Sequence, residues 1–138
     1  MKIVPPKIPL VYSCSGCSCA AQMANYLAVQ LDRKGLAEMS CIAGVGGQVK
    51  KLVRTALSAR KIVAIDGCAL GCSKACLAIH KIKPTLQIQL SNYKIKKHMH
   101  LDFDLVEAND ILTRVEAAVY EIRFIREGEL GYNSLENK

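Results

Sequence analysis

Short apolar runs recur along the chain and predict the strands of a sheet. Four runs have the length and composition of strands: Ile8–Tyr12, Met39–Ala43, Lys61–Asp66 and Leu86–Leu90. The last run alternates apolar residues with Gln87 and Gln89, which is typical of a half-exposed edge strand.

The segments between these runs carry apolar residues at helical spacing. We expect helices over residues 20–34 and 49–57 and a short helix from near Gly71. A last helix is expected to start after Asn109 or Asp110 and to end at Gly128. The glycines at positions 44, 46 and 47 predict a tight turn after the second strand.

The alternation of strands and helices predicts the fold class. It favours an α/β three-layer sandwich with a mostly parallel, four-stranded sheet, similar to a Rossmann fold. No linker or internal repeat divides the chain, so we expect a single α/β domain over residues 1–138 with its core at about 10–128. In such folds, ligands bind beyond the carboxyl ends of the strands.

The composition predicts a reduced, cytoplasmic protein. Hydrophobic residues make up 51% of the 138 positions, enough for a core that needs no disulfides. Prolines at positions 5, 6 and 9 interrupt any signal sequence, and no apolar run is long enough to cross a membrane. Seven cysteines, an odd number, therefore indicate metal binding or thiol chemistry rather than cross-linking.

The charge is positive but unevenly distributed. The net charge is +7, and residues 67–101 contain six lysines and no acidic residue. The run Lys94–Lys97 has only Tyr93 as an aromatic neighbour, which is too little for a base-stacking surface. We therefore expect no nucleic-acid partner.

Six of the cysteines follow predicted strands and should meet at one edge of the sheet. They are Cys14, Cys17 and Cys19 after the first strand, Cys41 in or after the second, and Cys68 and Cys72 after the third. Four thiolates complete a tetrahedral zinc site, and they also suit an iron–sulfur cluster. Cys76, four residues after Cys72 on a helix, could share an ion with it. An exposed thiol such as Cys17 would instead favour a redox role or transfer of sulfur or a metalloid.

Several motifs in order make the chain similar to the DGC-domain family, whose biochemical role is not established. The resemblance runs from about Leu10 to Asp104 and rests on Cys14-Ser-Gly, Met39-Ser-Cys-Ile-Ala-Gly-Val-Gly-Gly47, Ile65-Asp-Gly-Cys-Ala-Leu-Gly-Cys72 and His100-Leu-Asp-Phe-Asp104. It implies zinc chelation through four cysteines, which would here be Cys14, Cys41, Cys68 and Cys72. Spacing alone favours Cys17 over Cys41, so Cys17 and Cys76 remain additional or alternative ligands.

Overall fold

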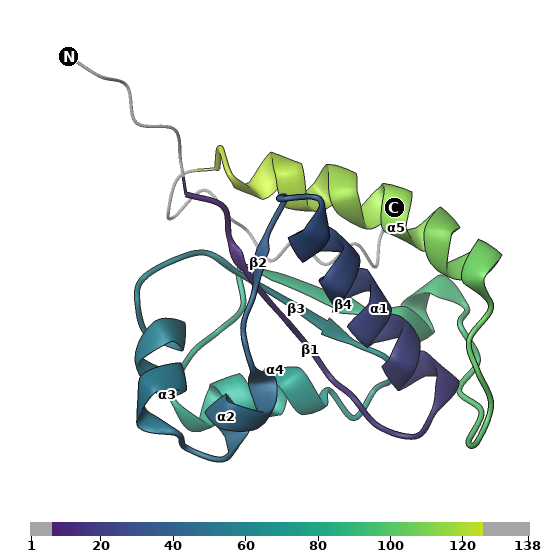
Figure 1. Cartoon of the computed structure of the whole chain (residues 1–138), viewed down its shortest axis with the longest axis horizontal. Helices are drawn as coiled ribbons and strands as arrows, with labels where there is room; N and C mark the ends of the chain where they lie inside the picture. The colour runs from purple at the N-terminus through teal and green to yellow at the C-terminus, as the bar shows by residue number, and fades with distance from the viewer. Residues whose placement is uncertain (1–6, 126–138) are drawn as a thin grey trace.

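A computed structural model describes residues 7–125 as strands and helices in alternation (Figure 1). The elements in chain order are β1 (Leu10–Ser13), α1 (Cys19–Arg33), β2 (Glu38–Met39), α2 (Ile42–Gly46), α3 (Lys50–Ala56), β3 (Ile62–Asp66), α4 (Cys72–Ile79), β4 (Leu86–Gln89), the 3₁₀ helix η1 (Leu90–Tyr93) and α5 (Leu105–Ile122). The last helix ends at Ile122, so the prediction that it continues to Gly128 is wrong, and Gly128 itself lies outside the described residues.

The sheet has four parallel strands in the order β2-β1-β3-β4, which confirms the predicted fold class. Leu10 pairs with Ile62, and Val63 pairs with Leu86. Every residue of β1 and β3 is buried, because these central strands have helices on both faces. All carboxyl ends lie at one edge, since the strands run in the same direction.

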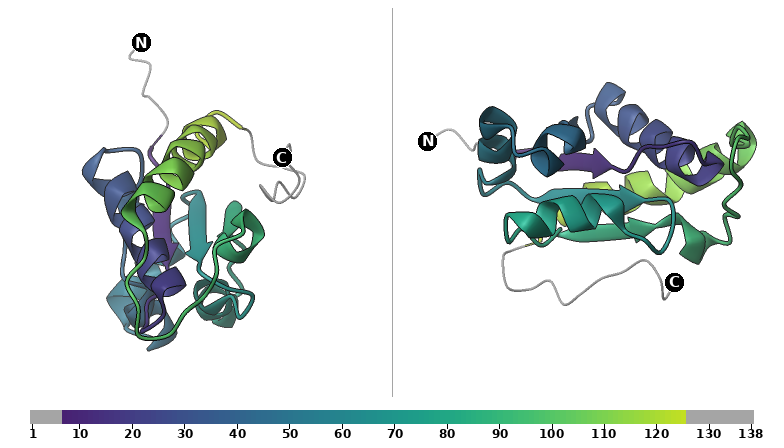
Figure 2. Two further views of the ribbon diagram at one scale, coloured as in Figure 1. Left: turned by 90° about the vertical axis from the view of Figure 1, so that its right-hand side faces the viewer. Right: turned by 90° about the horizontal axis from the view of Figure 1, so that it is seen from below.

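Two separate cores lie on the two faces of the sheet. One core joins β1 and β3 to α1 and α5 through residues such as Leu27 and Val115. The other joins the opposite face to α2, α3 and α4 through Val45, Ala56 and Leu77. The separation of these helical layers can be followed in Figure 2. The fold is therefore a three-layer sandwich.

The second strand is shorter than predicted. β2 covers only Glu38–Met39, and Ile42 and Ala43 belong to α2, where a tight turn was expected to follow a longer strand. Close packing stabilises this short helix. A Cβ on Gly44 would meet Leu52 of α3 at 1.9 Å, and one on Gly46 would meet Cys76 Sγ of α4 at 2.8 Å. Tertiary contacts therefore overcome the weak helix propensity of the glycines.

The last helix begins earlier than Asn109. Asp104 is its N-cap, and its carboxylate accepts a hydrogen bond from the Glu107 backbone N–H at 2.9 Å. The predicted start is wrong because Leu105 and Val106 are exposed and add nothing to the buried stripe. The cap therefore decides where this helix starts.

Candidate metal site

Asp66 is the last residue of β3, and its side chain caps α4 although the two are not adjacent in the sequence. The N-cap position of α4 is Gly71, which has a left-handed φ of 61° and no side chain to cap the helix. Asp66, only 1% exposed, accepts hydrogen bonds from the backbone N–H groups of Ser73 (2.7 Å) and Lys74 (3.2 Å). It also accepts one from the Gln87 side-chain amide at 3.0 Å. This carboxylate thus fixes Cys72, the first residue of α4, relative to the end of β3.

Replacing Asp66 by alanine should lower the free energy of unfolding by about 3 kcal/mol, because a buried cap with three hydrogen bonds is lost. Urea denaturation followed by circular dichroism measures this change. Asp104→Ala is the matched control, since Asp104 is an exposed cap with one hydrogen bond, and it should cost about 1 kcal/mol. Equal effects of the two substitutions would contradict the capping role of Asp66.

Gly67 allows the start of α1 to approach the end of β3. A Cβ at this position would lie 2.6 Å from the backbone carbon of Ala20 and 2.9 Å from the Ala21 nitrogen. The Gly67 N–H donates to Cys14 Sγ at 3.2 Å. The loop after β1 and the loop after β3 are therefore held together at this residue.

Four cysteines line one cavity beside Gly67. The cavity has a volume of about 180 Å³. Its cysteines are Cys14 and Cys17 from the loop after β1, Cys68 from the loop after β3, and Cys72 from the start of α4. Cys14 is buried, Cys68 is half-buried, and Cys17 and Cys72 are exposed. The structure therefore brings together three residues of the ligand set that the resemblance implies, together with Cys17.

Burial raises the pKa of the Cys14 thiol to about 11. The hydrogen bond from Gly67 lowers this pKa, and the nearby Asp66 carboxylate and the Cys72 and Cys68 thiols raise it, so that about 11 is the result of all these effects together. Cys14 is therefore a neutral thiol at physiological pH, and a metal ion that binds it has to displace its proton.

The raised pKa of Cys14 predicts a loss of stability at high pH. Because the unfolded state ionises near the ordinary value of 9.0 and the folded state near 11, folding loses free energy as the pH rises through this window. Urea denaturation of metal-free protein at a series of pH values measures the loss. Cys14→Ser removes the ionisation, so its stability relative to the parent should increase between pH 9 and pH 11. If the free energies of unfolding of the variant and the parent differ by the same amount at every pH in this window, the raised pKa of Cys14 is contradicted.

Cys41 and Cys76 lie away from this cavity. Cys41 is the exposed N-cap residue of α2 and lines a separate hollow with Ser13 and Ser15, which flank Cys14 in the chain. Cys76 faces α2, where its sulfur occupies the space beside Gly46. Burial raises the pKa of Cys76, and the Cys72 thiol and the Asp66 carboxylate add to this.

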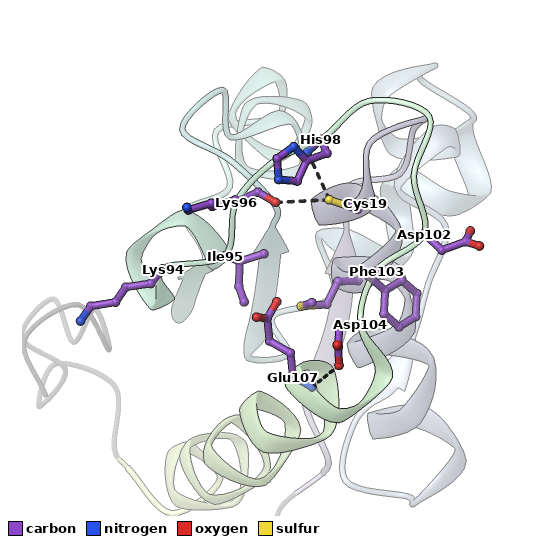
Figure 3. Close-up of a pocket in the computed structure, with 10 residues that line it drawn as sticks. Cys19, Lys94, Ile95, Lys96, His98, Asp102, Phe103, Asp104 and Glu107 are labelled. Atoms are coloured by element: carbon purple, nitrogen blue, oxygen red, sulfur yellow. Dashed lines mark hydrogen bonds between the residues drawn. The ribbon is translucent and has the colours of Figure 1, made fainter.

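Cys19 anchors a strap formed by residues 96–99. Its buried sulfur donates to the Lys96 carbonyl and accepts from the His98 backbone N–H, both at 3.2 Å (Figure 3). Ser18 and Met99 form an antiparallel bridge beside this contact. The Cys19 sulfur thus points toward the strap, and the residue has a structural role.

The strap brings a lysine to the cysteine cavity. Lys97 and Met99 both line the cavity, and Lys97 Nζ lies 3.5 Å from Cys68 Sγ. Sequence reasoning did not single out Lys97, although it lies in the basic run 94–97. Only the pairing of the strap with the start of α1 places it here. Its positive charge can offset part of the negative charge of clustered thiolates.

Neither a preformed metal cluster nor a membrane span is found in the described part of the chain. Across residues 7–125, no three Cys, His, Asp or Glu side chains already have the spacing of a metal site. Within the same residues, no helix has both the length and the apolar character needed to cross a bilayer. The four cysteines therefore surround the cavity without forming a compact ligand sphere.

Comparison with known proteins supports the resemblance seen in the motifs. A family model described as the DGC domain matches residues 10–115. The chain belongs to the DGC-domain family. This DGC-domain protein is also 54% identical over 109 residues to a Pseudomonas aeruginosa protein named anaerobic and virulence modulator AnvM. The match covers 79% of this chain and 83% of AnvM. No solved structure matches the chain.

Proposed function

We propose that this DGC-domain protein binds zinc through Cys14, Cys68, Cys72 and Cys17. The observation that carries the proposal is that these four thiols line a single cavity between the loops after β1 and β3. Thiolates are soft donors that suit zinc, and four of them complete a closed tetrahedral site. We also propose a cytoplasmic location, where the seven cysteines would be kept reduced and available to a metal ion.

The donor set and the size of the cavity fit one zinc ion. The four sulfurs are not yet close enough together to bind one ion. Zinc binding would therefore have to bring them closer, which moves the loop at Ser15 and Gly16 and the loop at Leu70 toward each other. Zinc binding would therefore order these loops, and it would release the proton of Cys14. The ammonium of Lys97 would reduce the cost of placing a site with four thiolates in this cavity.

Metal analysis of protein purified without added metal tests the proposal, and the Cys17→Ser and Cys41→Ser variants identify the fourth ligand. We expect about one equivalent of zinc in the parent and in Cys41→Ser, and a loss of most zinc in Cys17→Ser. If Cys41→Ser loses its zinc and Cys17→Ser keeps it, the ligand set implied by the family resemblance, which includes Cys41, is favoured instead. A parent that contains no zinc and binds none on addition would contradict the proposal.

An iron–sulfur cluster in the same thiolates is the alternative metal centre. Zinc–thiolate sites are colourless, whereas clusters absorb visible light at around 400 nm. A visible spectrum of protein purified without oxygen therefore distinguishes the two. A peak in this region, together with bound iron, would favour the cluster.

The exposure of Cys17 favours thiol chemistry as a second candidate function. In this case Cys17 would react in a redox reaction or carry sulfur or a metalloid. AnvM is named an anaerobic and virulence modulator, and this name is compatible with either a metal–thiolate site or a reactive thiol. If Cys17→Ser keeps its zinc but loses the thiol that reacts fastest with iodoacetamide in the parent, the reactive-thiol function is favoured.

A further inference from the structure

Another cavity is lined by residues from the start and middle of α3 and from the C-terminal end of α4. This cleft has a volume of about 440 Å³ and is lined by Gln48, Lys50, Val53, Arg54 and His80. It shares no residue with the cysteine cavity. Figure 1 shows α3 at an outer corner of the molecule, next to α2 and beyond the edge of the sheet. The cleft is therefore a different site from the proposed metal site.

The charged residues of this cleft are all basic. Lys50 and Arg54 are exposed and lie one helical turn apart, so their side chains project from the same side of α3. No carboxylate lines the cleft. Among residues 7–125, neither cation has an ion pair. Two unpaired cations this close together repel each other, and an anion placed between them would remove that repulsion.

The cleft also has an apolar wall. Val53 is half-buried and lines the cleft, and Val49 and Leu57, which flank α3 without lining the cleft, are 50% and 55% exposed. These residues belong to the apolar pattern that predicts a helix over residues 49–57. They stay uncovered because α3 packs mainly against the short α2 rather than against the sheet. A ligand in the cleft can thus bury apolar surface that the fold leaves in water.

The cleft is also lined by His80, whose ring has a fixed orientation. His80 caps the end of α4, and its Nε2 lies 2.9 Å from the Val45 carbonyl oxygen. Since a carbonyl can only accept, this nitrogen carries the hydrogen and the ring orientation is set. Gln48, which also lines the cleft, has a left-handed φ of 61°. Such a conformation is uncommon for a residue other than glycine and requires support from its surroundings.

We propose that this cleft binds a small organic anion, with a phosphate or carboxylate group on Lys50 and Arg54 and an apolar body against Val53. An inorganic anion would leave the apolar wall in water, and a neutral apolar compound would leave both cations without a partner. Arg54 can bind such a group through two parallel N–H donors, and Lys50 adds a second positive charge.

Titration with phenyl phosphate, followed by amide chemical shifts in NMR, tests this proposal. The full chain is used as purified, so that the state of the cysteine site does not change during the titration. We expect saturable shifts at Gln48, Lys50, Val53 and Arg54 and none at the cysteine cavity. Inorganic phosphate lacks the apolar ring, and benzyl alcohol lacks the anionic group. Each should therefore bind about tenfold more weakly than phenyl phosphate.

The double variant Lys50→Gln, Arg54→Gln should weaken phenyl phosphate binding by about tenfold or more, since two charge-assisted contacts are lost. Lys51→Gln is the matched control, because Lys51 belongs to the same helix but does not line the cleft. It should bind within about twofold of the parent. Absence of saturable binding, shifts centred elsewhere, or equal weakening by Lys51→Gln would each overturn the proposal.

Discussion

Replacing Cys68 by serine is expected to weaken zinc binding by about 3 kcal/mol or more, which is a loss of roughly a hundredfold in affinity. Cys68 follows directly after the two residues that fix the end of β3, so its position is set by a buried cap and a close backbone contact. It also lies beside Lys97. Competition with a chromophoric chelator measures the zinc affinity of the parent and the variant.

Cys76→Ser provides the matched control for Cys68→Ser. It makes the same chemical change on α4, but its sulfur faces Gly46 of α2 and not the cysteine cavity. We expect unchanged zinc affinity in this variant. Circular dichroism should show that both variants are folded, since Cys68 is only half-buried. Full zinc affinity in Cys68→Ser would contradict the proposed ligand set.

Replacing Gly67 by alanine is expected to destabilise the fold by about 3 kcal/mol. The added Cβ would meet the carbon and oxygen of Ala20 and the nitrogen of Ala21 at 2.6, 2.7 and 2.9 Å. These are all backbone atoms of the first turn of α1, so no side chain can rotate to make room. The helix would have to move away from the sheet. Thermal unfolding should show a midpoint lower by about 10 °C.

Gly16→Ala tests whether the effect at Gly67 comes from this contact. Gly16 lies in the loop that approaches the same region, but a Cβ there would meet only the Ala21 Cβ at an ordinary 3.9 Å. We expect a change of less than about 0.5 kcal/mol. The Gly67 variant should also bind zinc more weakly, because the movement of α1 separates Cys14 from Cys68. Similar midpoints for the two variants would contradict the steric explanation.

The sheet and its order of elements could be predicted because the strand pattern is strong. The apolar runs around Val11 and Val63 are too short for helices and are separated by segments with clear helical periodicity. This alternation leaves few topologies other than a parallel sheet. The same reasoning brings the loops that carry Cys14, Cys68 and Cys72 to one edge, where they line a common cavity.

The features that the sequence pattern did not predict depend on contacts between distant residues. The α2 helix forms around Gly44 and Gly46 because neighbouring side chains fill the space that these glycines leave. Lys97 reaches the cavity only because the strap pairs with Ser18. The early start of α5 did have a local signal, since Asp104 is followed three residues later by Glu107, a common pattern at helix starts.

The parallel pairing of β1 with β3 determines when the cysteine cavity can form during synthesis. The N–H group that hydrogen-bonds to Cys14 belongs to a residue 53 positions later in the chain. A ribosome adds this many residues in roughly 3–10 s, during which β1 has no partner on that side. Cys14 and Cys17 are then open to oxidants, and half of the proposed ligands do not yet exist. Zinc can therefore be captured by the complete site only after translation has passed Cys72.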